Sequence, residues 1–590
     1  MKKSTVLGIG GILGHDSNAA LLIDGQIVAS SQEERFTRIK HDAKFPYGAI
    51  DDCLRIAEIR PDQVESCVFA EKPLQSVVFD RTGAPSNPFT WRLARLVNDD
   101  YLAFPAAARK LLRNARFQYA WHHLSHAAAA FATSPFDRAV FLCVDGKGED
   151  VNATIGRVSA TSADILYELP FEYGLGMLYT VVTYYLGFDT YGSEYKVMGL
   201  APYGEPTFAK QLREFTETDS NGSLRLRKRA TFVWSVLEPV MQEFGRHLGL
   251  PPRRKNDPLT TDYVNLASSL QAMFEEEVLK MAEFAQKSTG ERNLIFCGGC
   301  AQNCVAAGKL RRSGLFDSVF NSPVGGDMGS AMGAAILGWQ QNVGRIDKVD
   351  DRGFYLGPEP GKLPAEALQF SVDYTGSIHR ATAGLLAEGH VVGWVRGRME
   401  LGARALGARS ILADPRVPEM QSVLNLKVKF RESFRPFAPA ILAEDCHEWF
   451  DSTEPSDFMQ YTAYLLPKHR HPVPAHFKGL RERLNFKRCD VPSVIHVDYS
   501  ARLQTVRSEV HPDLHRLISE FKRLTGLPMI INTSFNVSGQ PIVRTAEEAW
   551  LCFRHTEMDY LVINDTICRN PRDKTREEKL EWLKQFAKYS

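Results

Sequence analysis

A strand–turn–strand pattern occurs twice in the first third of this chain, and it limits the possible folds more than any other feature. The first copy covers residues 19–30 and turns at Asp24-Gly25. The second covers residues 139–158, with the loop Asp145-Gly146 between two apolar runs. An Asp-Gly dipeptide between short apolar runs is typical of paired β-strands. Helical stretches follow each copy, so the sequence predicts a duplicated α/β core.

Four further segments have patterns that predict local structure. Residues 191–204 are rich in glycine and are expected to form a loop. Residues 262–288 carry apolar residues at helical spacing, which predicts a long amphipathic helix. Residues 496–506 and 558–564 are predicted as strands, the second of which closes its sheet.

A pair of histidines precedes the second copy. His122 and His126 are four residues apart at the start of an alanine-rich run, a composition that favours a helix. Residues at i and i+4 share one helix face, so both imidazoles can reach the same atom. The next apolar strand ends at Asp145. Two imidazoles and one carboxylate are three of the four ligands of a divalent-metal site.

The histidine pair has two other interpretations. Paired histidines often do no more than fill a half-buried helix face, and the pair taken alone favours that reading. The spacing also resembles the HExxH helix of zinc peptidases, but His123 stands where that motif needs a glutamate base. A peptidase is therefore not expected.

Two glycine-rich loops later in the chain can bring backbone close to a ligand. A buried strand at residues 293–297 ends at Gly298 and Gly299, where the missing side chains permit close approach. Residues 323–335 form a glycine loop that opens into a helix of small residues, whose first amides suit a phosphate. In this loop Asp327 is either a fourth metal ligand or a helix N-cap, and its position alone does not decide.

A stretch rich in glycine, proline and charge, residues 347–364, separates two predicted domains, 1–354 and 365–590. In the second domain, residues 396–435 hold nine Lys and Arg against four Asp and Glu, in a chain of net charge +1. A solvated basic face is the default interpretation of such a run. Glycines and aromatic residues interrupt this one, which favours a pocket for anionic oxygens.

Composition argues against several classes of protein. The hydrophobic share of 44% and charged share of 24% are ordinary for a globular protein. Near-neutral charge gives no general surface for nucleic acid, and no apolar run has the length of a membrane span. Glycines interrupt the apolar residues of the N-terminus, which therefore resembles a strand and loop rather than a signal peptide, so we expect a cytoplasmic protein.

Cys297, Cys300 and Cys304 have a spacing that hints at an iron–sulfur cluster. No fourth cysteine lies nearby in the sequence, so buried thiols are favoured.

Ten short motifs, taken in order, resemble the NodU/CmcH-type O-carbamoyltransferases, which include enzymes that carbamoylate antibiotics and nodulation factors. The motifs span nearly the whole chain: GHDSNAALL, EERFTRIKHD, HHLSH, VDGKGE, EYKVMGLAPYG, GGCAQNC, GGDMGSAMGAA, GRMELGARALGARSILADPR, VKFRESFRPFAP and NTSFNVSGQPIV. Each motif is weak alone, whereas their joint order is specific. The chain departs from the usual pattern at Cys300 and Gln302, and where GARALGAR replaces GPRALGNR.

The resemblance implies a fold and a reaction. The first domain would be actin-like, similar to the threonylcarbamoyl transferase of tRNA modification, and the second would be YrdC-like. The YrdC-like domain would convert carbamoyl phosphate and ATP, used with Mg²⁺, into carbamoyl adenylate, phosphate and pyrophosphate. The first domain would then transfer the carbamoyl group to a hydroxyl of a natural product or sugar, with release of AMP.

The resemblance also assigns site residues. His15 would be the base and Lys40 would lie near the carbamoyl group, although without the resemblance they read as a loop histidine and a surface lysine. The ion, iron(II) by resemblance but manganese or zinc by ligand type, would be held by His122, His126, Asp145 and Asp327. Nucleotide contacts in the first domain would be Gly298, Gly299 and Asn303. Contacts to carbamoyl phosphate and ATP in the second domain would be Arg404, Lys429, Arg435, Arg502, Asn532, Ser534 and Asn536.

Three other functions stay open. A tRNA threonylcarbamoylation enzyme uses the same domain types, but the near-neutral charge counts against it. A non-catalytic actin-like nucleotide-binding protein would not need two separate anion sites. An iron-cluster protein is the third. The sequence does not identify the acceptor, and the family suggests a homodimer.

Overall fold

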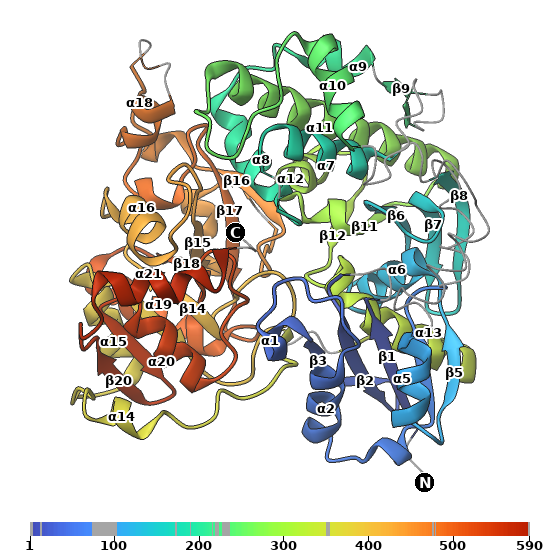
Figure 1. Cartoon of the computed structure of the whole chain (residues 1–590), viewed down its shortest axis with the longest axis horizontal. Coiled ribbons are helices and arrows are strands. Elements are labelled where there is room, and N and C mark those ends of the chain that lie inside the picture. Colours follow the sequence, from blue (N-terminus) through green and yellow to red (C-terminus); the bar gives the residue numbers. More distant parts are fainter. Residues whose placement is uncertain are drawn as a thin grey trace. The chain divides into compact units, whose positions relative to one another are not determined.

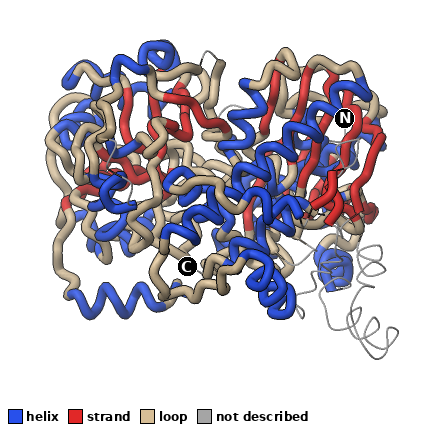
Figure 2. Tube along the Cα trace, turned by 90° about the horizontal axis from the view of Figure 1, so that it is seen from above, coloured by secondary structure: helices blue, strands red, loops and turns tan. Residues whose placement is uncertain are grey.

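The chain forms two compact units, which combine helices with strands (Figure 1, Figure 2). The first unit comprises Met1–Thr37 and His41–Asp350, and the second comprises Arg38–Lys40 and Asp351–Ser590. Residues 350–353, inside the predicted boundary, lie outside the described residues. The computed structural model describes residues 4–11, 15–72, 103–170, 174–188, 190–214, 216–218, 224–226, 237–349, 354–452, 454–474, 477 and 480–587.

Two five-stranded sheets form the centre of the first unit. The order of the first sheet is β3-β2-β1-β4-β5, with β1 Thr5–Gly10, β2 Asn18–Ile23, β3 Gln26–Gln32, β4 Ser66–Phe69 and β5 Arg116–Tyr119. The order of the second sheet is β12-β11-β6-β7-β8, with β6 Arg138–Val144, β7 Val151–Ser159, β8 Ala163–Pro170, β11 Asn293–Cys297 and β12 Ser318–Asn321. A separate short pair joins β9 Thr216–Thr218 and β10 Leu224–Leu226.

The two five-stranded sheets have the same strand order and the same strand directions. In each, the first strand pairs antiparallel with the second, and the second pairs antiparallel with the third. The first strand is also parallel to the fourth, and the fourth is parallel to the fifth. The duplication predicted from the repeated Asp-Gly pattern is therefore present in the sheets.

Two helices lie between these sheets. Helix α6 (His122–Ala132) follows the first sheet in the chain but packs on strands of the second, whereas α13 (Ser330–Val343) follows the second sheet and packs on the first. The two helices also pack against each other. Gly333 permits this contact, because a Cβ at that position would lie 1.8 Å from the Ser125 carbonyl oxygen.

The other helices of the first unit include a segment that the sequence did not predict as helical. Residues 191–204 were expected to be a loop because of their glycines, but α8 forms there and buries Val197 and Leu200. Helix-forming Glu, Lys, Met and Leu lie between those glycines, and burial of the apolar face stabilises the turn. The helices are α1 Glu34–Thr37, α2 Tyr47–Ile56, α5 Ala103–Leu111, α7 Leu175–Tyr185, α8 Glu194–Leu200, α9 Ala209–Glu214, α10 Leu237–Leu248, α11 Thr261–Thr289 and α12 Cys304–Arg312.

An eight-stranded mixed sheet forms the centre of the second unit, in the order β16-β17-β15-β18-β14-β13-β19-β20. Its strands are β13 Val392–Val395, β14 Arg409–Ala413, β15 Ala438–Leu442, β16 Tyr461–Tyr464, β17 Ser500–Val506, β18 Met529–Ser534, β19 Tyr560–Ile563 and β20 Thr566–Arg569. Its helices are α14 Ala365–Leu368, α15 Ile378–Ala387, α16 Met420–Val423, α17 Cys446–Trp449, α18 Leu480–Asn485, α19 Pro512–Thr525, α20 Ala546–Arg554 and α21 Arg576–Lys584.

The predictions of two strands of this sheet were partly wrong. Residues 496–506 were predicted as one strand, but β17 begins only at Ser500, because residues 496–500 form a turn in which the His496 amide donates to the Ser500 carbonyl oxygen at 2.8 Å. Residues 558–564 were predicted to close the sheet. Instead, a turn at Asn564, with φ of 49°, leads into β20, which forms the edge.

The register of the eight-stranded sheet places five polar residues on one face. Ser410 lies opposite Ser534 across β14 and β18. Asn532 and Gln504 lie opposite alternate residues of β15, and Arg502 is two residues from Gln504. Cross-strand partners and residues two apart point to the same side of a sheet. All five side chains therefore share one face. Within the described part of the chain, no helix has the length and apolarity needed to cross a bilayer.

Candidate functional site

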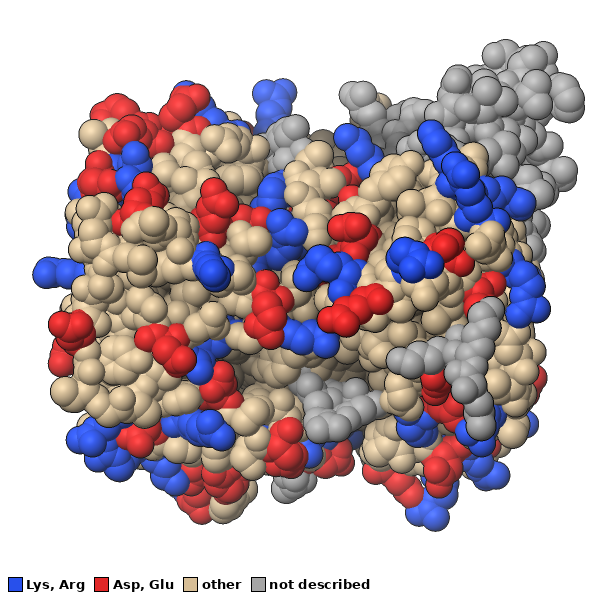
Figure 3. All heavy atoms as spheres, turned by 90° about the horizontal axis from the view of Figure 1, so that it is seen from below, with Lys and Arg blue, Asp and Glu red and all other residues tan. Residues whose placement is uncertain are grey.

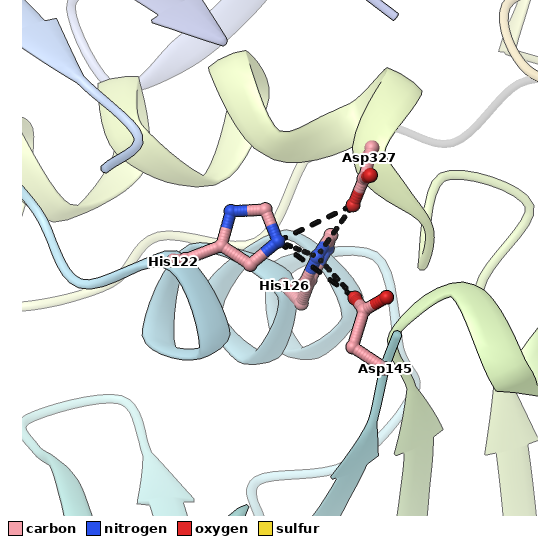
Figure 4. Close-up of side chains that lie close together, drawn as sticks. All are labelled: His122, His126, Asp145 and Asp327. Carbon is pink, nitrogen blue, oxygen red and sulfur yellow. Dashed lines mark hydrogen bonds and ion pairs between the residues drawn. The ribbon is translucent and has the colours of Figure 1, made fainter. Parts of the chain in front are cut away.

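Four side chains from three separate segments of the first unit meet at one point (Figure 4). The Nε2 atoms of His122 and His126 are 3.0 Å apart. Asp327 Oδ1 lies 3.3 and 3.1 Å from these two nitrogens, and Asp145 Oδ2 lies 3.7 and 3.1 Å from them. The four atoms all lie within 4.8 Å of one another. This is the ligand set predicted from the sequence and the resemblance, brought together.

Local backbone fixes the carboxylate of Asp145 at the end of β6. The amide of Gly146 donates to Oδ1 at 2.7 Å, and the amide of Gly299 donates to Oδ2 at 3.1 Å. Gly298 has a φ of 88°, and a Cβ there would lie 2.3 Å from the Val144 carbonyl oxygen. The two glycines thus allow their loop to lie close to Val144 and Asp145. Their predicted contact with a nucleotide stays a prediction.

The structure distinguishes the two roles considered for Asp327. Gly326 occupies the N-cap position of the short 3₁₀ turn that starts at Asp327, and Gly329 occupies the N-cap position of α13. Asp327 is therefore not an N-cap, and its carboxylate points at the two imidazoles (Figure 4).

Two buried glutamates surround His122 and were not predicted as site residues. Glu71 Oε1 lies 3.4 Å from His122 Nδ1, at the outer edge of hydrogen-bonding distance. Glu149 Oε1 accepts hydrogen bonds from the backbone amides of His122 and Lys72, at 3.0 and 3.1 Å. A carboxylate behind an imidazole fixes its tautomer and turns the other nitrogen toward a metal. Glu149 ends the VDGKGE motif, whereas no motif marks Glu71.

The charges of the four central side chains fit a divalent cation. Burial opposes protonation of His126, but hydrogen bonds with Asp145 and Asp327 raise its pKa to about 9. Burial likewise opposes protonation of His122, and the same two carboxylates hold its pKa well above the usual value. Burial disfavours the charged carboxylates, yet the histidines hold the pKa values of both aspartates below their usual range. Two protons thus balance two carboxylates, a charge that one divalent ion would replace, and the mixed N/O donors suit iron(II), manganese or zinc.

His15 lies beside this centre and contacts two carboxylates. Its Nδ1 is 3.2 Å from Asp16 Oδ2 and 3.1 Å from Asp327 Oδ2. Asp16 also contacts His41 Nδ1 at 2.8 Å, and the Tyr191 ring lies 4.9 Å from the His15 ring in a tilted contact and 5.2 Å from the His41 ring in an edge contact. Because Nδ1 faces only acceptors, it carries a proton, and Nε2 is the nitrogen left for proton exchange. Burial opposes the charge, but Asp327 and Asp16 raise the pKa of His15 to about 9.

Asp16, His41 and Tyr191 were not predicted as site residues. The first two stand inside quoted motifs, GHDSNAALL and EERFTRIKHD, so position in a motif was the available signal. Asn303, predicted to contact a nucleotide, has a structural partner set. Its Oδ1 accepts from the Ala306 amide at 3.1 Å as the N-cap of α12, and its Nδ2 donates to Gln271 at 2.9 Å.

Lys40 is grouped with the second unit, together with Arg38. Arg38 donates to the carbonyl oxygens of Pro541 and Ile542 at 2.8 and 2.9 Å, and pairs with Glu548 at 3.1 Å. The segment is therefore fixed to the loop before α20.

Lys429 is the centre of a buried polar cluster in the second unit. Its Nζ donates to the Ser534 carbonyl oxygen at 2.6 Å, to Ser534 Oγ at 3.2 Å and to Asn536 Oδ1 at 2.7 Å. Burial lowers the pKa of Lys429 well below its usual value, and the charges of Arg431, Arg435 and Lys40 lower it further. Three residues predicted to bind carbamoyl phosphate or ATP are thus in contact.

The other residues predicted for this site in the second unit have contacts of their own. Arg435 pairs with Glu432 at 3.5 Å. Arg502 and Asn532 share the sheet face of Ser534, and Asn532 holds the loop that carries Arg404 through the Ala405 carbonyl oxygen. Arg431, which was not predicted, lies over the Phe437 ring and donates to Asn425 Oδ1 at 2.6 Å.

Matches to two families cover most of the chain. The family described as Carbamoyltransferase N-terminus matches residues 5–336, and the one described as Carbamoyltransferase C-terminus matches residues 383–570. The chain belongs to the carbamoyltransferase family. The resemblance stated from the motifs is thereby confirmed, and the protein is a transferase enzyme.

Relatives of this carbamoyltransferase align over most of its length. The uncharacterised protein sll1178 of Synechocystis sp. is 40% identical over 98% of this chain and 99% of its own. Nodulation protein NolNO of Sinorhizobium fredii is 34% identical over 95% of this chain and 80% of its own. The 3'-hydroxymethylcephem-O-carbamoyltransferase of Streptomyces clavuligerus is 28% identical over 94% of this chain and 98% of its own. Both units are mixed α/β, while the names actin-like and YrdC-like stay predictions.

Proposed function

We propose that this carbamoyltransferase makes carbamoyl adenylate from carbamoyl phosphate and ATP, and transfers the carbamoyl group to a hydroxyl of a small-molecule acceptor. The observation that carries the proposal is the convergence of His122, His126, Asp145 and Asp327 beside His15, in a chain of this family. A relative named as an O-carbamoyltransferase, similar over 94% of this chain, supports a hydroxyl acceptor.

The second unit would catalyse the adenylate step. Water first displaces phosphate from carbamoyl phosphate and leaves carbamate. A carbamate oxygen then attacks the α-phosphorus of ATP, and the bond to pyrophosphate breaks. This step holds several anions together, which requires cations and N–H donors in a protected site. Lys429, buried against Ser534 and Asn536, would supply N–H donors. Arg404, Arg435 and Arg502 would supply positive charge.

The first unit would catalyse the transfer. The acceptor oxygen attacks the carbamoyl carbon, and the bond between that carbon and the phosphate oxygen of AMP breaks. The proton of the hydroxyl passes to Nε2 of His15, whose Nδ1 is held by Asp16 and Asp327. The charge of Asp327 raises the pKa of His15, and an ion bound to Asp327 would offset that charge, lower this pKa and leave Nε2 free to accept. A divalent ion held by the four central side chains would supply Lewis-acid polarisation of the carbamoyl oxygen. Lys40, a residue of the second unit, is proposed to contact the carbamoyl group, and Gly298 and Gly299 of the first unit are proposed to contact the nucleotide.

Two single-site variants test whether the second unit catalyses the adenylate step and the first unit the transfer. Lys429→Ala should abolish pyrophosphate release from ATP and carbamoyl phosphate, whereas Lys427→Ala, at an exposed position two residues away, should not. His126→Ala should retain pyrophosphate release but lose carbamoylation of a panel of hydroxylated metabolites. Unimpaired pyrophosphate release in Lys429→Ala would contradict the first assignment, and full carbamoylation by His126→Ala would contradict the second.

Charge distribution counts against a role on tRNA. On the face shown in Figure 3, Lys and Arg side chains are interspersed with Asp and Glu, and the whole chain has a net charge of +1. A nucleic-acid partner usually requires a basic patch. Adenylate turnover that requires added tRNA would reverse this assignment.

A further inference from the structure

A fully buried glutamine on β17, Gln504, links the loop of Arg404 to the sheet of the second unit. Its Nε2 donates to the Leu406 carbonyl oxygen at 3.2 Å. Its Oε1 accepts from Asn532 Nδ2 at 2.7 Å, and the same Nδ2 donates to the Ala405 carbonyl oxygen at 3.2 Å.

The direction of this chain of hydrogen bonds follows from its two ends. A carbonyl oxygen can only accept, so both amide side chains must turn their NH₂ groups toward the loop. The Tyr355 hydroxyl also lies 3.3 Å from the Leu406 carbonyl oxygen, but it is 2.7 Å from His511 Nδ1. His511 Nε2 must donate to the Asp457 carbonyl oxygen at 3.1 Å, so Nδ1 accepts the tyrosine proton. Gln504 is therefore the donor that serves Leu406.

This arrangement leaves one buried hydrogen-bond acceptor, Asn532 Oδ1, without a partner among the described residues. Asn532 is 1% exposed, and its Oδ1 has no hydrogen-bond partner among the described residues. Ser410 Oγ, opposite Ser534 on the same sheet face, is also buried without such a partner. Buried polar atoms without partners are rare in folded proteins, because the lost hydration is not replaced. An acceptor at this place requires a ligand or water that donates.

We infer that Gln504 is a positioning residue, which holds the amide of Asn532 so that Oδ1 accepts an N–H of the carbamoyl group. The inference deepens the proposed function and rests on it. It makes Asn532 a reader of the NH₂ of carbamoyl phosphate. Acetyl phosphate has nearly the same shape but carries a methyl group there, so it leaves Oδ1 without a donor. A site built around such a hydrogen bond rejects the analogue that lacks it.

The test is steady-state pyrophosphate release by the full-length enzyme, with carbamoyl phosphate as substrate and acetyl phosphate as competing inhibitor. Gln504→Met removes both hydrogen bonds at similar volume. It should raise the KM for carbamoyl phosphate about tenfold and change the Ki for acetyl phosphate by less than about twofold. Asn532→Leu should give a similar loss of selectivity. The double variant should be no worse than Asn532→Leu alone, because one residue acts through the other.

Asn570→Leu is the matched control, since this buried side chain donates to three carbonyl oxygens of the same unit and is remote in sequence from the loop. It should lower the melting temperature without changing the ratio of Ki to KM. An unchanged ratio in Gln504→Met, or additive effects in the double variant, would overturn the inference. Wild-type enzyme that releases no pyrophosphate would overturn the proposed function itself and the inference with it. A Gln504→Met protein that does not fold leaves Asn532→Leu to decide, because unchanged selectivity there overturns the inference.

Discussion

Glu71 lies behind His122, and its effect should be visible in metal affinity. Glu71→Leu removes the carboxylate 3.4 Å from His122 Nδ1, so the imidazole loses the group that orients it. We expect a 10- to 100-fold weaker affinity for iron(II) or zinc, in the range typical of such outer carboxylates. Titration against a competing chelator measures this. Glu71→Gln keeps an acceptor at the same position and should lose less, and equal affinities in all three proteins would contradict the assignment.

His511 should make the stability of the second unit depend on pH. Burial lowers the pKa of His511 to about 4, against 6.5 for an ordinary histidine. Between pH 6.5 and pH 4, this histidine is therefore protonated in the unfolded chain but neutral in the folded chain. The free energy of unfolding falls as the pH drops from about 6.5 to about 4. The loss over this window is on the order of 3 kcal/mol.

His511→Gln can keep a donor for Asp457 and an acceptor for Tyr355 while removing the titration. Urea unfolding at pH 7 and pH 4.5 should show a smaller pH dependence in this variant than in the wild type. Equal pH dependence in the two proteins would show that other groups are responsible.

Local patterns predicted residues of the central cluster in the first unit, but they did not predict residues that distant strands bring together in the second unit. His122 and His126 follow from helical spacing, and Asp145 follows from its place after an apolar strand. Gln504 reads as one polar residue in an alternating strand, and only its pairing across β15 brings it to Asn532. Such a pairing depends on sheet order and register, which a single sequence does not encode locally.

At the scale of elements, the close contact of α6 and α13 should control the metal site. A methyl group at Gly333 would lie 1.8 Å from the Ser125 carbonyl oxygen, next to His126. Gly333→Ala should push the helices apart, destabilise the protein by about 2–3 kcal/mol and lower the bound metal content. Gly384 in α15 is the control, because a Cβ there meets nothing within 4 Å.

Gly384→Ala should be neutral or stabilise by about 0.5–1 kcal/mol, since alanine favours a helix more than glycine. Denaturant unfolding and metal analysis of both variants provide the comparison. Equal stability and metal content in Gly333→Ala and the wild type would show that the helices can separate without consequence.

Elements with strong periodicity were predictable, and short elements between turns were not. The 29-residue helix α11 and the hairpin β2–β3 match their predicted positions closely. Helix α8 was not predicted, because Gly199 within it and the glycines on either side of it favour a loop, and the helix has only seven residues. The edge strand β20 has only four residues, too few for a pattern to stand out.

For the whole molecule, removal of the metal should separate the two reactions. Treatment of the full-length enzyme with a chelator, followed by addition of Mg²⁺ alone, should leave pyrophosphate release within about twofold and reduce carbamoyl transfer about 100-fold or more. Restoration of iron(II) should recover transfer. A parallel loss of both reactions would contradict separate sites.

The matching order of the two five-stranded sheets gives β1 and β6 equivalent places. The segment after β1 carries His15 and Asp16, and the segment after β6 carries Asp145. If both halves descend from one ancestral half, these loops began as copies and diverged, one toward proton exchange and the other toward ion binding. Neither loop can then replace the other, so a substitution that inactivates either loop would abolish carbamoyl transfer completely.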